Sequence, residues 1–129
     1  MAVIDIKELK TAVLQEIEEH RAGDGPGEFC DKKENGPELY GATAAVNIHA
    51  ILGIPFGSFE QRKAWAERII AFQNDNGTFS AIQGNGEGHA MAMVLQALNL
   101  LCAPIPRNIG PLAPLDPAEL KAWINDHDW

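Results

Sequence analysis

The decapeptides GEFCDKKENG (residues 27–36) and GTFSAIQGNG (residues 77–86) repeat one pattern fifty residues apart. Each begins with glycine, a variable residue, phenylalanine and a small residue, and each ends with asparagine-glycine. Because glycine adopts backbone conformations that other residues resist, each decapeptide predicts a tight loop. An alanine-rich stretch follows each of them. We therefore expect each loop to fold one helix back onto another, with Phe29 and Phe79 packed between the two helices.

Three helix starts stand in register with these loops. Each has a short oxygen side chain at the cap and Glu or Gln three residues later, which is the pattern of a capping box. Five residues after each cap comes a lysine, a small residue, and then alanine or tryptophan. The three caps are Asp5-Ile6-Lys7-Glu8, Ser58-Phe59-Glu60-Gln61 and Asp116-Pro117-Ala118-Glu119. The three steps that follow them are Lys10-Thr11-Ala12, Lys63-Ala64-Trp65 and Lys121-Ala122-Trp123.

The first two starts predict amphipathic outer helices over residues 6–20 and 59–73. Apolar residues recur at helical spacing on one face of each, and charged residues occupy the other face. We expect Gly23 and Asn76-Gly77 to stop them in a left-handed conformation. The expected apolar faces contain Ile6, Leu9, Val13, Leu14 and Ile17 in the first helix, and Phe59, Ala66, Ile69, Ile70 and Phe72 in the second.

Residues 39–52 and 89–102 predict a different kind of helix. Apolar and small residues occur on all sides, and neither stretch holds an acidic or basic residue except its histidine. A helix that is hydrophobic all round is a buried helix, and its small residues let neighbouring helices approach closely. Gly53 and the Ala103-Pro104 step are expected to end the two segments.

The repeating unit is thus an outer helix, a glycine-phenylalanine loop, an inner helix and a short proline turn. It occupies about residues 5–55 and 58–104, and it begins again over residues 116–129. Such hairpins cannot bury their apolar faces alone, so they stack on one another. We predict a single all-α domain of repeated helical hairpins.

Composition and charge narrow the possible functions. The 129 residues contain 10 Lys and Arg against 18 Asp and Glu, a formal charge of −8. Nucleic acids and anionic membranes demand clustered positive charge, so neither is expected as a partner. The first ten residues show no basic region followed by an apolar run, so a signal peptide is not expected, and Cys30 and Cys102 form no CxxC pair. We expect a cytoplasmic protein with reduced thiols, and the reactivity of either thiol stays open.

A family resemblance follows from residues 63–79. Lys63-Ala64, Ile69-Ile70, Gln73 and Gly77-Thr78-Phe79 resemble the glutamine-tryptophan repeat of the terpene cyclase and protein prenyltransferase superfamily. The chain departs from that motif at Phe79, where the family has tryptophan, and only Gly27-Glu28-Phe29 matches in the first unit. The resemblance implies an incomplete α/α toroid, the N-terminal segment of a longer ring. Its partners would be the remaining toroid hairpins or further copies of this chain.

The same resemblance places a ligand cavity near the N-termini of the inner helices. Tyr40 and His89 align there as candidate catalytic residues, and Glu38 and Glu87 are weaker candidates. A histidine titrates near neutral pH and can shuttle protons. The alternative is structural: the two acids complement the helix dipoles, while Tyr40 and His89 cap or pack.

Metal and cofactor chemistry are not expected. The family's zinc ligands are Asp, Cys and His, but Cys30-Asp31 has the reverse order and no ligand doublet supports it. Asp126-His127-Asp128 resembles only part of the DxDD cluster of class II terpene cyclases, and it is expected on an outer helix rather than at the head of an inner one. No phosphate-binding glycine motif is present.

Two functions are open at this stage, and the chain is not assigned as an enzyme. One is an enzyme acting in the ring cavity on a carbohydrate, or alternatively on an isoprenoid-like substrate. Carbohydrate is preferred because few arginines are available for a diphosphate. The other is a non-catalytic helical-repeat scaffold for protein interaction or self-association.

Overall fold

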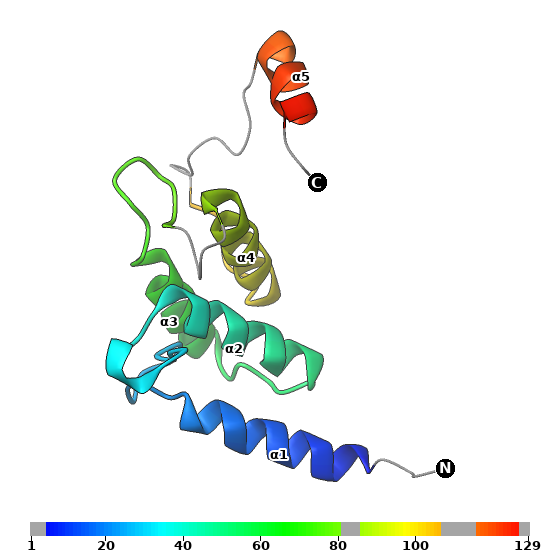
Figure 1. The fold of residues 1–129 in the computed structure, drawn as a ribbon. Coiled ribbons are helices and arrows are strands. Elements are labelled where there is room, and N and C mark those ends of the chain that lie inside the picture. The colour runs from blue at the N-terminus through cyan, green and yellow to red at the C-terminus, as the bar shows by residue number, and fades with distance from the viewer. Residues whose placement is uncertain (1–4, 81–85, 107–115, 127–129) are drawn as a thin grey trace.

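The computed structural model describes residues 5–80, 86–106 and 116–126, and the named elements within these ranges are all helices (Figure 1). In chain order the elements are α1 (Ile6–Glu19), η1 (Lys33–Asn35), α2 (Leu39–Ile51), α3 (Phe59–Ile70), α4 (Glu87–Leu100) and α5 (Pro117–Asp126). Within these ranges the only extended pairings are two isolated bridges. The all-α class is therefore confirmed. In the part of the chain that is described, none of the helices combines the length and the apolar character that crossing a bilayer requires.

The three expected helix starts all carry a capping side chain. The Ser58 start is a complete capping box, in which Ser58 Oγ accepts from Gln61 N and Gln61 Oε1 accepts from Ser58 N at 2.8 Å. At the other two starts the aspartate side chain accepts from the first turn, Asp5 from Lys7 N and Asp116 from Ala118 N. The second bond of a capping box, from the cap amide to the Glu or Gln side chain three residues later, therefore forms at Ser58 alone among these described starts.

The two glycine-phenylalanine loops have matching backbones. Gly27 and Gly77 both have positive φ, at 77° and 82°. In each loop the phenylalanine two residues later forms an antiparallel bridge with a residue that follows the preceding helix, Arg21 to Phe29 and Gln73 to Phe79. Phe29 and Phe79 are 1% and 0% exposed. The prediction that both phenylalanines are buried within the core is confirmed.

The expected left-handed stops of the outer helices are wrong. Helix α1 ends at Glu19, within one residue of the prediction, whereas α3 ends at Ile70, three residues before the predicted end. Gly23 is not left-handed, because the residue of the first loop that needs positive φ is Gly27. Gly77 is left-handed, but it lies in the loop that precedes Phe79 rather than at the end of α3. The glycines serve the turn of the loop, and the helices stop before it.

The inner helices form the centre of the fold. Helix α2 packs against α3 and α4, and α3 packs against α4 (Figure 1). Val46 of α2 and Val94 of α4 are fully buried, and Ala44 is half-buried. Glu16 on α1 and Glu67 on α3 are exposed. The predicted wet acidic faces of the outer helices are confirmed. The inner helices are not buried on all sides, because Ile51 is 82% exposed and Gln96 is exposed.

Trp65 joins α3 to the first loop and to α2. Its ring stacks on Phe29 with centroids 5.5 Å apart, lies 5.5 Å from the His49 ring, and meets Phe56 edge-on at 6.0 Å. Trp65 is 6% exposed. Offset and edge-on pairs of aromatic rings contribute beyond the area they bury. These three contacts make the chief connection between the first helical pair and α3.

An ion pair reinforces the same connection. Arg68, one turn after Trp65, donates from Nη2 to Glu28 Oε1 at 2.9 Å, and the second carboxylate oxygen of Glu28 accepts from Gly25 N at 2.9 Å. Both side chains are about two-thirds buried, with 32% and 28% exposure. A two-sided carboxylate contact of this kind holds the first loop in one geometry against α3.

Helix α1 covers the fold with one half only. Val13 packs against the core and Ile17 is 6% exposed, but Ile6 and Leu9 are 76% and 53% exposed. The expected burial of Ile6 and Leu9 is therefore wrong, because α1 meets the core only towards its C-terminal end. Phe59, at the start of α3, is likewise 66% exposed instead of buried.

Helix α2 ends just before Gly53, as predicted, and this glycine is left-handed. Gly53 has φ +64°, and its N–H donates to Ala50 O at 3.1 Å. The next amide, Ile54 N, donates to His49 O at 2.8 Å. This pair of bonds is a Schellman motif, in which the left-handed position favours glycine.

Helix α4 ends in the same motif, but with Cys102 at the left-handed position. Cys102 has φ +54°, and its N–H donates to Asn99 O at 3.0 Å. Ala103 N donates to Leu98 O at 2.9 Å. The Cys102 side chain is exposed, and the left-handed conformation strains its backbone.

The matched motifs predict opposite effects on stability. Cys102→Gly relieves the left-handed strain and should raise the free energy of unfolding by about 1 kcal/mol. Gly53→Ala introduces the same strain into α2 and should lower it by a similar amount. Urea unfolding followed by far-ultraviolet circular dichroism measures both variants. Loss of stability in Cys102→Gly would contradict the assignment of strain to this residue.

Candidate functional site

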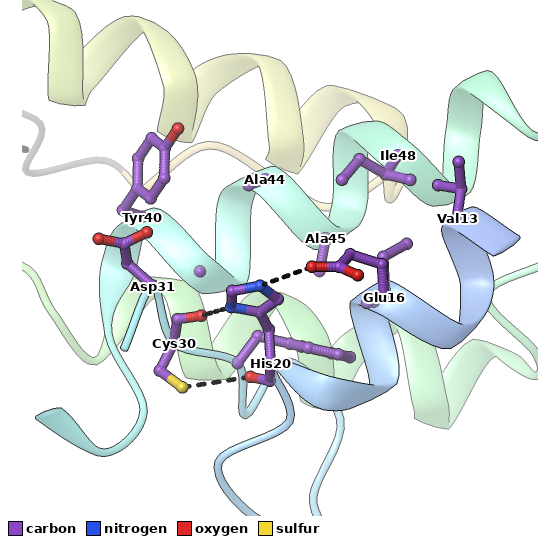
Figure 2. Close-up of a pocket in the computed structure, with 12 residues that line it drawn as sticks. Val13, Glu16, His20, Cys30, Asp31, Tyr40, Ala44, Ala45 and Ile48 are labelled. Carbon is purple, nitrogen blue, oxygen red and sulfur yellow. Dashed lines mark hydrogen bonds and ion pairs between the residues drawn. The ribbon is translucent and has the colours of Figure 1, made fainter. Parts of the chain in front are cut away.

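A pocket of about 300 Å³ lies between α1 and α2 (Figure 2). The first loop closes one side of it, and most of its wall is apolar. Two carboxylates, a histidine and a tyrosine supply the polar groups. The lining residues are Val13, Glu16, Ile17, His20, Phe29, Cys30, Asp31, Tyr40, Gly41, Ala44, Ala45 and Ile48.

Small residues on α2 account for this space. Gly41, Ala44 and Ala45 occupy the side of α2 that lines the pocket, and α1 is not closely packed against α2. At Gly41 a Cβ would collide with the backbone of Phe29 and Cys30. Gly41 therefore allows the first loop to approach α2 closely. The small residues of α2 were expected to serve contacts between helices, and at Gly41 this expectation is wrong. Beyond this contact the two alanines leave room that no side chain fills.

His20 is held in one orientation at the rim of the pocket. Its Nδ1 lies 3.0 Å from the carbonyl oxygen of Cys30, and its Nε2 lies 3.7 Å from Glu16 Oε1 (Figure 2). A carbonyl oxygen only accepts, so Nδ1 carries the proton in this bond. In the neutral ring Nε2 is then an acceptor, and in the protonated ring it forms an ion pair with Glu16. Glu16 and His20 are four residues apart and share one face of α1.

Cys30 lines the pocket as a protonated thiol and not as a nucleophile. Its Sγ donates to His20 O at 3.3 Å, and the residue is 2% exposed. Burial, together with the nearby Glu38 carboxylate, raises the pKa of the Cys30 thiol. The thiol therefore stays protonated at neutral pH, and a protonated thiol is a poor nucleophile. Cys30 and Cys102 are both free, in agreement with the predicted absence of a disulfide.

The four residues expected at the heads of the inner helices do not share a site. Tyr40 lines the pocket with Asp31. Glu38 precedes α2, where one carboxylate oxygen accepts from Asp31 N and the other from Asn35 Nδ2 at 3.4 Å. Glu87 and His89 are both exposed in the first turn of α4, and neither lines this pocket. Tyr40 and Glu38 thus belong to the pocket region, and the other two do not.

The candidate metal ligands are likewise separated. Cys30 and Asp31 line the pocket without His89. Within the described ranges no group of three or more His, Cys, Asp or Glu side chains is placed to hold a metal ion. In the Asp126-His127-Asp128 stretch, residues 127 and 128 lie outside the described residues, as does Arg107.

The Glu16–His20 pair was missed from the sequence. Glu16 was assigned to the wet face of α1, and His20 to the end of that helix. A signal for the pair exists in their i, i+4 spacing. The small residues of α2 could not indicate a pocket by themselves, because the same residues also suit close helix packing.

His49 is a second constrained histidine, on α2 one turn after Ala45, and it does not line the pocket. Its ring stacks on Phe56 at 5.8 Å and lies tilted against Trp65. Its Nδ1 is buried and has no hydrogen-bond partner among the described residues. Burial lowers the pKa of His49 below its usual 6.5, although the Glu18 carboxylate opposes this shift. His49 is therefore a neutral member of an aromatic cluster.

Comparisons of this chain with protein-family models, with curated proteins and with solved structures found no match.

His49 makes stability depend on pH. The folded protein holds the pKa of His49 below 6.5, so the unfolded chain takes up the proton first as pH falls. This contribution is complete above pH 6.5 and is lost as pH falls from there towards the folded-state pKa. His49→Leu should remove this loss. It should also raise the free energy of unfolding at pH 7.5 by about 1 kcal/mol, because it removes a buried, unpaired nitrogen.

Leucine is the suitable replacement, since Leu98 occupies the equivalent position before the end of α4 and is 0% exposed. Urea unfolding at pH 7.5 and 5.5 tests this prediction, with the exposed His89→Gln as control. An unchanged pH dependence in His49→Leu would contradict it.

Proposed function

We propose that this protein is a non-catalytic scaffold of helical hairpins that assembles with further copies of itself. The hairpins would be those of an incomplete α/α toroid, in which each outer helix docks on the preceding hairpin. Two observations support the proposal: the matching backbones of the two glycine-phenylalanine loops, and the packing of Trp65 of α3 against the first hairpin. In such repeats each unit contacts only its neighbours, so the unit at the edge offers a surface to the next one.

The observation that carries this proposal is the contrast between α3 and α5. Helix α3 is seated on the first hairpin by Trp65, the last residue of its Lys63-Ala64-Trp65 step. The sequence of α5 repeats this step at Lys121-Ala122-Trp123, five residues after a capping aspartate. Figure 1 shows α5 apart from the other helices, and it makes none of the close helix pairings. Helix α5 thus repeats the sequence step that holds Trp65 in α3, but it packs closely against none of the other described helices.

The second hairpin repeats the positions that form the seat of Trp65; of these, Phe79 and Leu98 are already buried and Ile105 alone is exposed. Trp65 sits against Phe29, His49 and Phe56. The counterparts in the second hairpin are Phe79 of the loop, Leu98 before the Schellman motif, and Ile105, three residues after the left-handed position, as Phe56 is three residues after Gly53. Ile105 is 54% exposed, whereas Phe56 is half-buried against Trp65. An exposed apolar side chain in this place fits a surface that another helix covers.

We assign this seat to α5 of a second copy. In this structure α5 is extended away from its own second hairpin, and the connecting residues 103–116 contain four prolines. Proline-rich segments act as semi-rigid spacers. Exchange of an identical element between copies makes a dimer with few new contacts.

An enzyme acting on a carbohydrate or an isoprenoid-like substrate is the second candidate. Its one supporting observation is that Tyr40 lines the pocket. It also needs His89 on the same surface as Tyr40. In the scaffold proposal Tyr40→Phe and His89→Ala leave assembly unchanged.

Light scattering after size-exclusion chromatography tests the scaffold proposal. The 14.0 kDa chain should elute with twice its mass at micromolar concentration. Trp123→Ala should shift the protein towards the monomer by at least about tenfold in dissociation constant, because a buried tryptophan at an interface commonly dominates its affinity. A chain shortened to residues 1–115 should be monomeric.

Asn125→Ala, an exposed residue of the same helix, is the matched control and should remain dimeric. A monomeric wild-type protein, or a dimer that survives both Trp123→Ala and the truncation, would overturn the proposal.

A further inference from the structure

We propose that the pocket between α1 and α2 is a binding site for a small organic cation, a primary amine carried on a short apolar body. Three observations lead there: the size of the pocket, the sign of the charges on its wall, and the polar atoms at its rim. The site is distinct from the assembly surface proposed above, which involves α5 and the second hairpin.

The size of the pocket sets the size of the ligand. About 300 Å³ corresponds to the liquid volume of about ten water molecules, so the pocket holds a body of about ten non-hydrogen atoms. The wall around this volume is formed by Val13, Ile17, Phe29, Ala44 and Ile48. Small-molecule sites have this character, an apolar cavity with a few placed polar groups. The wall fits an alkyl chain or one aromatic ring.

The charges on the wall select a cation. Glu16 and Asp31 line the pocket, and no lysine or arginine is among the lining residues. Glu38 lies behind Asp31 and accepts from its backbone amide. Lys32 and Lys33 follow Asp31 in the sequence, but neither lines the pocket. Lys33 lines a different hollow, together with Thr11, Leu14 and Glu18. A carboxylate ligand would meet two like charges, whereas an ammonium group would meet two opposite ones.

The polar atoms at the rim match the donors of an ammonium group. An ammonium group has three N–H donors and no acceptor. The bond from His20 Nδ1 to the Cys30 carbonyl leaves Nε2 of the neutral ring as an acceptor. Glu16 Oε1 lies 3.7 Å from this Nε2, and the Tyr40 side chain lines the same cavity. Figure 2 shows Glu16 and His20 turned toward each other across the rim. The head group belongs between them, with its apolar body inside.

Titration of the protein with n-octylamine, octanoate and 1-octanol at pH 7.5 tests the proposal. Amide shifts in ¹H–¹⁵N spectra report the affinity and the place of binding. n-Octylamine should bind with a dissociation constant on the order of 1 mM, as expected for a ligand of this size. Its shifts should centre on residues 13–20, 29–31 and 40–48. Octanoate should bind at least about fivefold more weakly, and 1-octanol should lie between the two.

Three variants separate the pocket from non-specific binding. Ala44→Leu fills the cavity and should abolish binding of all three probes. Glu16→Gln should weaken n-octylamine about three- to fivefold and leave 1-octanol unchanged; the effect is modest because the Glu16 side chain is 72% exposed. Glu19→Gln, an exposed acid of the same helix that does not line the pocket, is the matched control and should bind like the wild type.

Octanoate binding as tightly as n-octylamine, or n-octylamine binding unchanged in Ala44→Leu, would overturn the proposal. The chain shortened to residues 1–115 should bind n-octylamine normally, because the pocket lies wholly within the first hairpin. A failure of this proposal is therefore distinguishable from a failure of the assembly proposal.

Discussion

The stacking of Trp65 on Phe29 is the contact on which the rest of the arrangement depends. Phe29 belongs to the loop that closes the first hairpin, and Trp65 belongs to the helix that opens the second. Between them they bring α2, α3 and the first loop to one point, where His49 and Phe56 complete the cluster. The ion pair of Glu28 with Arg68 fixes the same two elements from the side. With α3 seated in this way, α4 lies against both α2 and α3.

The first hairpin differs from the second because nothing seats its outer helix in the same way. At the position of Trp65, α1 has Ala12, an exposed residue. Helix α1 therefore relies on Val13 and Ile17, and its N-terminal half extends past the core with Ile6 and Leu9 exposed. The loose contact between α1 and the small residues of α2 leaves the pocket. The opening in the first hairpin thus accompanies an alanine at the position that Trp65 holds in α3.

The sequence predicted the parts of this fold that depend on local chemistry. The capping residues, the inner helices and the buried loop phenylalanines follow from side-chain type and spacing, and Phe29, Phe79 and Val94 are buried as expected. The errors arise where tertiary contact decides. Burial of Leu9 was expected from helical periodicity, which cannot show that the core ends before that residue. The left-handed conformation of Cys102 could not be predicted from its residue type. The hydrogen bonds of the Schellman motif require a left-handed residue at this position, which is usually glycine.

The candidate site shows the same division. Tyr40 was placed at the head of an inner helix by alignment of the two units, and it lines the pocket there. Its expected companion His89 does not, since alignment of repeats brings equivalent positions into register along the chain but does not turn their side chains into one cavity. The Glu16–His20 pair depends on the space between α1 and α2. That space results from the sum of several small side chains, and no single residue signals it.

A double-mutant cycle between Phe29 and Trp65 tests the central contact most directly. The free energy of unfolding is measured by urea titration for the wild type, Phe29→Leu, Trp65→Leu and the double variant. Direct stacking predicts that the double variant loses less stability than the sum of the single variants, by about 0.5–1.5 kcal/mol. Additive losses within about 0.3 kcal/mol would show that the two rings are not energetically coupled, and would contradict the account.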